Sequence, residues 1–344
     1  MHHLRQHIPQ CIISLFLLLL ILLAHSVGLP VAALLSDALV RLGMNGVLTL
    51  AMLPMVRAGA GLNFGLPFGI IAGLLGMTLA VNFRFTGLYG FAGALLLSLP
   101  FAMLLGWLYA RLLNRVRGRE EIAGIFAGFS LIFVMNFFWS VAPFTNPAML
   151  WPIGGQGLRP TVNLQPYFGK SLNKLLLVTG DGWQLPLGLL AAFFLLCAVV
   201  HCFFRLRLGR AMIAVGDNED FARLAGVNIQ RTRTVAIMLS TVLAALGICF
   251  YAQSYGFLEL YDAPLLLAFP AASSLLLGGY AGAGGSVGQV VLGTLLFQTL
   301  YVFTGPLANE LLAPQVSEIL RSLITNSVIL YSLFYEGRRR RAGK

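Results

Sequence analysis

Residues 234–255 read TVAIMLSTVLAALGICFYAQSY and contain no charged side chain. A helix rises 1.5 Å per residue, so about 20 apolar residues cross the hydrocarbon core of a bilayer, which is roughly 30 Å thick. We therefore expect a membrane-spanning helix here.

The rest of the chain has the same character. Of its 344 residues, 58% are hydrophobic and 10% are charged, and the mean hydropathy is +0.84. An average globular chain is about one-quarter charged, so a soluble fold is excluded. The sequence predicts an all-α, polytopic transmembrane helix bundle of about ten spans, forming one domain over residues 1–344. The expected spans are 11–30, 38–56, 64–83, 87–110, 122–141, 184–204, 234–255, 263–280, 287–304 and 318–335.

Two of these expectations stay open. The third and eighth spans are rich in Gly and Pro and can be broken or re-entrant. The first span resembles the apolar segment of a signal peptide, but residues 25–29 hold no clear small-residue cleavage site, so a retained helix is favoured.

Basic residues predict the orientation. The net charge is +11, with 23 Lys and Arg against 12 Asp and Glu. Of the basic residues, 17 fall on one side of the predicted bundle. The other six are Arg41, Arg84, Arg159, Lys170, Lys174 and Arg321. Cytoplasmic loops carry the excess of positive charge, so both termini and the loop 205–233 are predicted to be cytoplasmic, and the loop 142–183 extracytoplasmic. The positive charge indicates contact with membrane lipids and no nucleic-acid partner.

Chemistry-bearing motifs are scarce. The twelve acidic residues fall in loops or at predicted helix ends, unlike the intramembrane carboxylates that proton- and sodium-coupled carriers commonly use. The chain has no phosphate-binding loop, HExxH or GxSxG motif, so we expect no enzyme activity, catalytic residue, metal or cofactor. The spans carry neutral polar residues instead, and each can bind a polar solute or a neighbouring helix. They are Asn45, Asn63, Asn82, Asn136, Gln253, Ser273, Ser274 and Gln298.

Residues 61–73 read GLNFGLPFGIIAG, with a glycine at every fourth position. This spacing predicts a ridge along one helix face, where another backbone can approach closely. Pro67 removes a helix hydrogen bond, so the segment 63–69 is expected to bend or unwind, and a bend of this kind can line a solute path.

The predicted cytoplasmic loop contains signals for one short helix over residues 217–225. Asp217 or Asn218 can cap its first amides, acidic Glu219 suits its positive end, and Gly226 can adopt the left-handed stop. Phe221, Leu224 and Ala225 fall on one face. From the residues alone, this face fits lipid headgroups or a groove on a partner equally well.

The run GRAMIAVGDNEDFARLAGVNIQRTR (209–233), followed by LLLGGYAGAGGSVGQVVLGTLL (275–296), resembles the permeases of bacterial ABC importers. This family includes the ribose-type, simple-sugar, nucleoside and branched-chain amino-acid permeases. In it, the element GDN-x-x-x-ARLAG is the coupling helix that docks into a cytoplasmic ATPase. The resemblance implies that the docking residues are Gly216, Asp217, Asn218, Glu219, Phe221, Ala222, Arg223, Leu224 and Gly226.

A second, looser resemblance bears on the solute. Residues 63–69, NFGLPFG, are similar to the NIGxEGQ element of the nucleoside and simple-sugar branch, although Pro67, Phe68 and Gly69 replace its Glu-Gly-Gln. The expected substrate path comprises Asn63, Gly65, Pro67, Asn136 and Gln253.

The resemblance implies an inner-membrane permease subunit for a small polar solute, a simple sugar or a nucleoside. The implied partners are cytoplasmic ATPase subunits, a second permease copy or homologue, and an extracytoplasmic solute-binding protein. The alternatives are a branched-chain amino-acid or vitamin importer permease, and a passive channel or carrier that works alone.

Overall fold

The structure is a computed structural model that describes residues 8–151, 157–280 and 284–311, and six positions beyond them, 319, 322, 323, 326, 327 and 330. The described chain is mostly helical. Its helices are α2 (Ile8–Ser26), α3 (Val31–Arg57), α4 (Pro67–Asn82), α5 (Gly87–Arg115), α6 (Glu120–Val141), α7 (Ser171–Lys174), α8 (Leu187–Arg205), α9 (Arg207–Asp217), α10 (Glu219–Leu224), α11 (Ile229–Tyr255), α12 (Ala263–Leu266), α13 (Ala268–Leu277) and α14 (Val287–Leu311). Its strands are β1 (Thr161–Asn163), β2 (Leu177–Gly180), β3 (Trp183–Pro186) and β4 (Phe257–Glu259).

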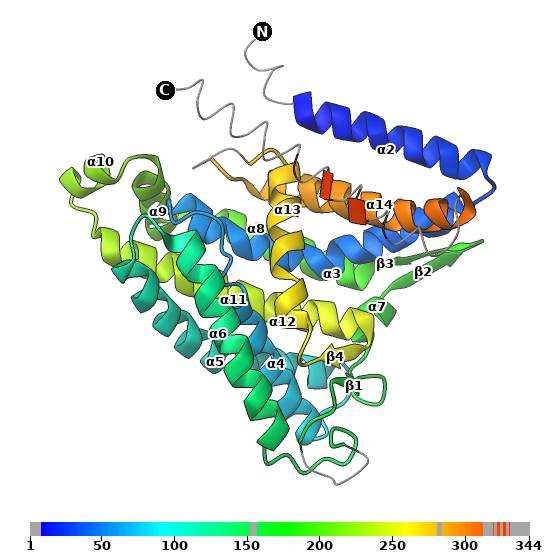
Figure 1. The fold of residues 1–344 in the computed structure, drawn as a ribbon, viewed down its shortest axis with the longest axis horizontal. Coiled ribbons are helices and arrows are strands. Elements are labelled where there is room, and N and C mark those ends of the chain that lie inside the picture. The colour runs from blue at the N-terminus through cyan, green and yellow to red at the C-terminus, as the bar shows by residue number, and fades with distance from the viewer. Residues whose placement is uncertain are drawn as a thin grey trace.

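Helix α11 lies at the centre of the bundle. It packs against α3, α4 and α5 and is buried along most of its length. Its sequence is apolar on every side, as expected for a helix that is surrounded by other helices. The two ends of α11 lie far apart, with α9 and α10 beside one end and α7, β1 and β4 near the other (Figure 1).

Six helices in the described part of the chain are long and apolar enough to cross a membrane: α3, α5, α6, α8, α11 and α14. Three shorter apolar segments, 10–26, 67–82 and 263–277, coincide with the expected first, third and eighth spans. The eighth is broken at Leu267 into α12 and α13, as its composition suggested. Most of the expected last span, 318–335, lies outside the described residues, as do residues 1–7 and 331–344 at the termini.

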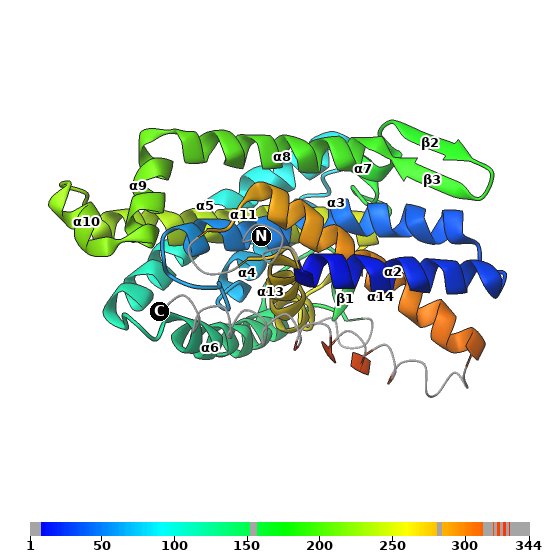
Figure 2. The same cartoon turned by 90° about the horizontal axis from the view of Figure 1, so that it is seen from above.

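The strands form two small antiparallel pairs at the end of the bundle opposite α10. Strand β1 pairs with β4, with Thr161 opposite Glu259, and β2 pairs with β3 in a hairpin that extends beyond α8 (Figure 2). The β1–β4 pair joins the loop 142–183 to the segment that follows α11. The described parts of the long predicted loop, 142–151 and 157–183, therefore contain regular structure.

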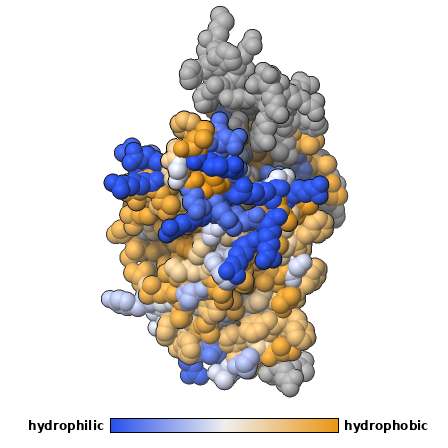
Figure 3. Space-filling view, turned by 90° about the vertical axis from the view of Figure 1, so that its left-hand side faces the viewer, coloured by the Kyte–Doolittle hydropathy of each residue, from blue (hydrophilic) through white to orange (hydrophobic). Residues whose placement is uncertain are grey.

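The surface separates by polarity. Seen from the α10 end, hydrophilic residues gather over that face and hydrophobic residues cover much of the surface around them (Figure 3). Large apolar side chains are exposed along α6, including Phe126, Phe133 and Phe137. Exposed apolar helix faces next to a polar end are typical of a protein that is surrounded by lipid.

Candidate functional site

The short helix predicted in the loop 205–233 is present as α10. The Asn218 side chain accepts a hydrogen bond from the Phe221 backbone N–H at 2.9 Å, so Asn218 is the N-cap. Asp217, the other candidate cap, is the last residue of α9. Gly226 has φ +80°, the left-handed conformation that ends a helix. Both local signals are confirmed.

Helix α10 is anchored by one side and presents the other. Ala222 is fully buried in a small cluster with Val215 and Ile229. Phe221 and Leu224 point away from this cluster, with exposed fractions of 66% and 89%. The apolar face predicted from the sequence is thus an uncovered surface at the polar end of the molecule.

Gly216 joins this loop to the end of α3. A Cβ atom built on Gly216 would collide with the Arg57 carbonyl oxygen and would lie 3.0 Å from the Gly59 backbone nitrogen. Gly59 itself has φ +69° and faces the Gly216 Cα. The two chain segments touch through their backbones, so no side chain fits between them.

Ion pairs add further links at this end. Glu219 accepts from Arg117 at 2.8 Å, in the turn between α5 and α6, and lies 3.5 Å from Arg223 on its own helix. The second pair joins residues i and i+4 on one helix face. Arg233 and Glu120 form a separate, mostly buried pair between α11 and α6.

Residues 58–66 between α3 and α4 are not helical. Pro67 is at the first turn of α4, where a proline lacks no needed hydrogen bond, so it begins the helix rather than bending one. The unwinding expected around Pro67 therefore falls entirely before it. Gly61 and Gly65 belong to the unwound segment, and only Gly69 and Gly73 lie on the helix.

Asn63 ties this unwound segment to two helices. It is fully buried, its Oδ1 accepts from the Tyr109 hydroxyl at 3.1 Å, and its Nδ2 donates to Ser240 Oγ at 2.7 Å. Gly65 lies against the Tyr109 ring, where a Cβ would collide. Asn63 thus holds the entrance of α4 to α5 and α11, and its role in a solute path stays a prediction.

The other expected path residues lie elsewhere. Gln253 is fully buried, with Oε1 accepting from the Leu172 N–H at 3.2 Å and Nε2 donating to Asn173 at 3.1 Å. Asn136, on α6, has a buried Oδ1 without a hydrogen-bond partner among the described residues. The structure does not bring Asn63, Asn136 and Gln253 together around one cavity.

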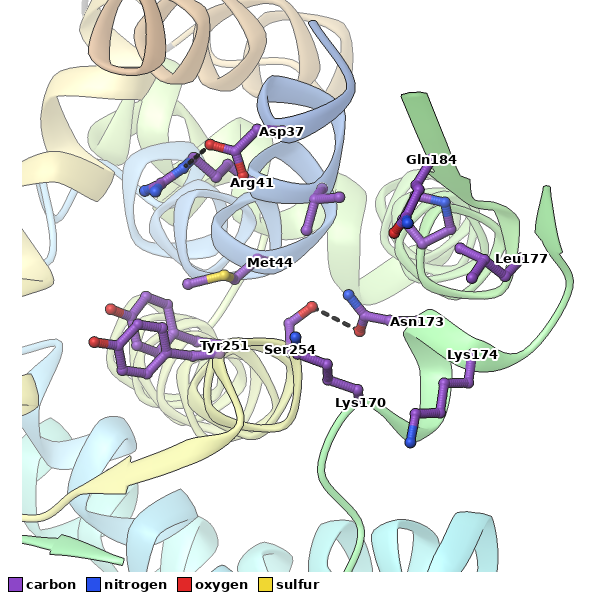
Figure 4. A pocket seen from close by; sticks show the side chains of 13 residues that line it. Asp37, Arg41, Met44, Lys170, Asn173, Lys174, Leu177, Gln184, Tyr251 and Ser254 are labelled. Atoms are coloured by element: carbon purple, nitrogen blue, oxygen red, sulfur yellow. Dashed lines mark hydrogen bonds and ion pairs between the residues drawn. The ribbon is translucent and has the colours of Figure 1, made fainter. Parts of the chain in front are cut away.

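Two cavities open beside α3 and α11 instead. The first, which we name the loop-side cavity, has a volume of about 460 Å³ and is lined by Asp37, Arg41, Lys170, Asn173 and Tyr251, among others. Figure 4 shows Asp37 and Arg41 on α3 and Tyr251 on α11, with Lys170, Asn173 and Lys174 on another side.

The second, the helix-lined chamber, has a volume of about 320 Å³ and lies between α3, α11, α13 and α14. Its polar lining includes Asn45, Ser273 and Gln298. Its aromatic lining is formed by Tyr251, Phe269, Phe297 and Tyr301. The neutral polar lining was visible in the sequence, but its convergence on one chamber depends on how the helices pack.

Arg41 and Tyr251 line both cavities and so form the partition between them. Arg41 donates to Asp37 at 2.9 Å, and its guanidinium lies 5.3 Å from the centre of the Tyr301 ring. Sequence reasoning assigned Arg41 to the extracytoplasmic side, and Asp37 to a loop or helix end. The structure places both within α3, on one face at i and i+4, which is the signal that could have paired them.

Comparison with known proteins gives one family. The model for the branched-chain amino acid transport system / permease component matches residues 34–330. The nucleoside ABC transporter permease protein NupB of Lactococcus lactis subsp. cremoris (strain MG1363) is 26% identical over 147 residues, which are 42% of this chain and 38% of that protein. The chain therefore matches well under half the length of this curated relative. No solved structure gives a significant match.

Proposed function

Because the chain belongs to the branched-chain amino acid transport system / permease component family, a family of multi-pass membrane transport subunits, we propose that it is the permease of an ATP-binding-cassette importer for a small polar solute. The observation that carries the proposal is the uncovered apolar face of α10. Phe221 and Leu224 are held in the open by a capped helix whose opposite side is buried.

A groove on a cytoplasmic ATPase fits this face better than a lipid surface. Asp217, Glu219 and Asp220 surround the start of α10, and an anionic leaflet repels carboxylates. A protein groove can accept an apolar helix face and pair its charged rim. The lack of a phosphate-binding motif in this chain also calls for a separate ATPase subunit.

The solute proposed is neutral, a simple sugar or a nucleoside. The helix-lined chamber contains amide and hydroxyl side chains, and its one charged side chain from the helices, Arg41, is paired with Asp37. The nucleoside permease with partial similarity supports the same class. Amide and hydroxyl side chains can hydrogen-bond an uncharged solute, and this binding needs no coupling ion.

The remaining partners follow from the same arrangement. We propose that a solute-binding protein docks on the loop 142–183, together with the β4 segment, in which Glu259 pairs with Thr161 of the loop. The pKa of the Glu259 carboxyl lies above its ordinary value, mainly because of burial and secondly because of the nearby charge of Asp262. A second permease copy or homologue would pack against a lipid-facing side.

The test is Leu224→Asp, which places a charge on the docking face without changing the buried side of α10. We expect the variant to insert into the membrane normally but to lose co-purification of the ATPase and solute-stimulated ATP hydrolysis. Leu176→Asp is the control, because Leu176 is also an exposed leucine, at 70%, and lies in the loop near the opposite end of the bundle. Its φ of +55° is also one that Asp tolerates well.

The control should retain ATPase co-purification, which is the readout that compares the two variants, because Leu176 lies in the loop proposed to receive the solute-binding protein. Normal ATPase co-purification and uptake in Leu224→Asp would refute the docking assignment.

A further inference from the structure

Gln298 lies in the wall of the helix-lined chamber with an unused amide. Only 4% of the residue is exposed, and in the part of the chain that the structure describes its side chain makes no hydrogen bond. Its amide atoms are not among the fully enclosed side-chain atoms that lack a partner, so the amide faces the chamber. Buried amides are nearly always hydrogen-bonded, because leaving one unpaired is costly. An amide without a protein partner that faces a cavity is available to water or to a solute that enters the cavity.

Gln253 shows what a structural glutamine looks like in the same bundle. Both ends of its amide are bonded to protein, to Leu172 and to Asn173. Gln298 has neither kind of partner, although it is almost as deeply buried. The difference cannot be attributed to residue type.

Three other polar side chains around the chamber are already engaged, whereas Asn326 also lines it as an exposed amide. Asn45 Nδ2 donates to the Arg41 carbonyl at 3.1 Å, and Ser273 Oγ donates to the Phe269 carbonyl at 2.7 Å. The Arg41 guanidinium is held by Asp37 and the Tyr301 ring. Gln298 is thus the buried side chain of the lining that offers both a donor and an acceptor.

The surroundings of this amide are aromatic. Tyr251, Phe269, Phe297 and Tyr301 line the same chamber, and aromatic rings favour stacked or edge contacts with other flat rings. A glutamine amide pairs with a neighbouring donor and acceptor on the edge of a nucleobase. A carboxylate fits less well, because Arg41 is already paired with Asp37.

We propose that Gln298 recognises the base edge of a nucleoside, and that the helix-lined chamber is the solute site of this permease. The proposal rests on the proposed importer function and narrows its solute from a sugar or nucleoside to a nucleoside. It also moves the site from the unwound segment around Asn63 to the space between α3, α11, α13 and α14.

The test is Gln298→Leu in the complete importer, expressed with its ATPase and binding protein in a host without its own nucleoside uptake. Labelled uridine is the probe, and unlabelled ribose and leucine are the competitors. We expect wild-type uptake of uridine that neither competitor blocks, and a fall of about tenfold or more in the variant, because both bonds to the base are lost. The thermal midpoint in detergent should stay unchanged, since Gln298 makes no hydrogen bond within the described part of the protein that the substitution could remove.

Gln253→Leu is the matched control. It removes a satisfied amide and leaves the Leu172 N–H without its partner, while Asn173 keeps its bond from Ser254, so it should lower the thermal midpoint. Unchanged uridine uptake in Gln298→Leu would overturn the site assignment, as would a fall in uptake that is matched by an equal loss of thermal stability. Absence of uridine uptake in the wild type, or its inhibition by ribose or leucine, would overturn the nucleoside class. In each of these outcomes, ATPase co-purification would still report separately on the importer function.

Discussion

Gly69 and Gly73 mark the place where α4 approaches α11 most closely. A Cβ on Gly69 would collide with the Thr241 carbonyl oxygen and with Ala244, and one on Gly73 would collide with Ile248. Gly69 and Gly73 lie one helical turn apart on α4, and their partners Ala244 and Ile248 lie one turn apart on α11. The repeat seen in the sequence is therefore a packing seam in its helical part, and close backbone approach is its physical reason.

We expect Gly69→Ala to destabilise the permease by about 1–3 kcal/mol, because the added methyl forces α4 and α11 apart. Gly288→Ala is the matched control, since Gly288 is also helical and a Cβ there meets only the Ser286 hydroxyl, at 3.9 Å. The control should be neutral, or more stable by up to about 1 kcal/mol. Thermal midpoints in one detergent measure both variants, and equal midpoints would contradict a packed seam.

Sequence reasoning identified the neutral polar residues but could not rank them. Asn63, Gln253 and Gln298 look alike in an apolar run, and only the folded structure shows that the first two are bonded to protein. Their partners, Ser240 and Leu172, are distant in the chain. Whether a buried amide is available for a solute is a tertiary property, which explains why the predicted path and the chamber share no residue.

At the scale of elements, the unwound segment 58–66 connects the two ends of the proposed mechanism. Gly59 touches Gly216 of α9, the Leu62 N–H donates to Glu121 at 3.3 Å, and Asn63 bonds to Tyr109 and Ser240. We expect a displacement of α9 and α10 to press directly on this segment, which lies outside the helices and has only isolated turn bonds within it. Such a segment can change shape at lower cost than a helix.

We expect Gly216→Ala to separate docking from transport. The added methyl would collide with the Arg57 carbonyl and push the loop away from the segment 58–66, while the exposed face of α10 stays intact. The ATPase should still co-purify, but uptake per ATP hydrolysed should fall several-fold. Leu224→Asp provides the contrast, because it should lose the ATPase altogether. Full uptake in Gly216→Ala would show that this backbone contact does not transmit the movement.

Signals between neighbouring residues predicted the ends of the short helix α10 well. Features that depend on a longer stretch of the chain were predicted less well. The cap at Asn218 and the stop at Gly226 are properties of neighbouring residues, so they were readable in the sequence. The start of α4 at Pro67 was not readable in the sequence, because the regular spacing of glycines continues across Pro67. Helix α9 was also missed as a separate element, since it is amphipathic and short.

At the scale of the whole molecule, composition was sufficient to predict the fold class. The all-helical membrane bundle was predicted from charge content and apolar runs, and six long apolar helices are present among the described residues. The orientation and the count of ten stay predictions. The order of the helices around α11 was not predictable, because apolar runs carry little information about which neighbours they contact.

The pairing of Asp37 with Arg41 has an electrical consequence. Moving one elementary charge across a membrane costs or gains about 2.3 kcal/mol per 100 mV. A neutral solute carries no charge across the membrane, and the charges of Asp37 and Arg41 cancel within their pair. We therefore expect the uptake rate to be independent of membrane potential. Proteoliposomes with a potassium gradient and valinomycin would measure this, and a rate that follows the imposed voltage would contradict it. The concentration that the cell reaches would then depend on its ATP supply and not on its electrical state.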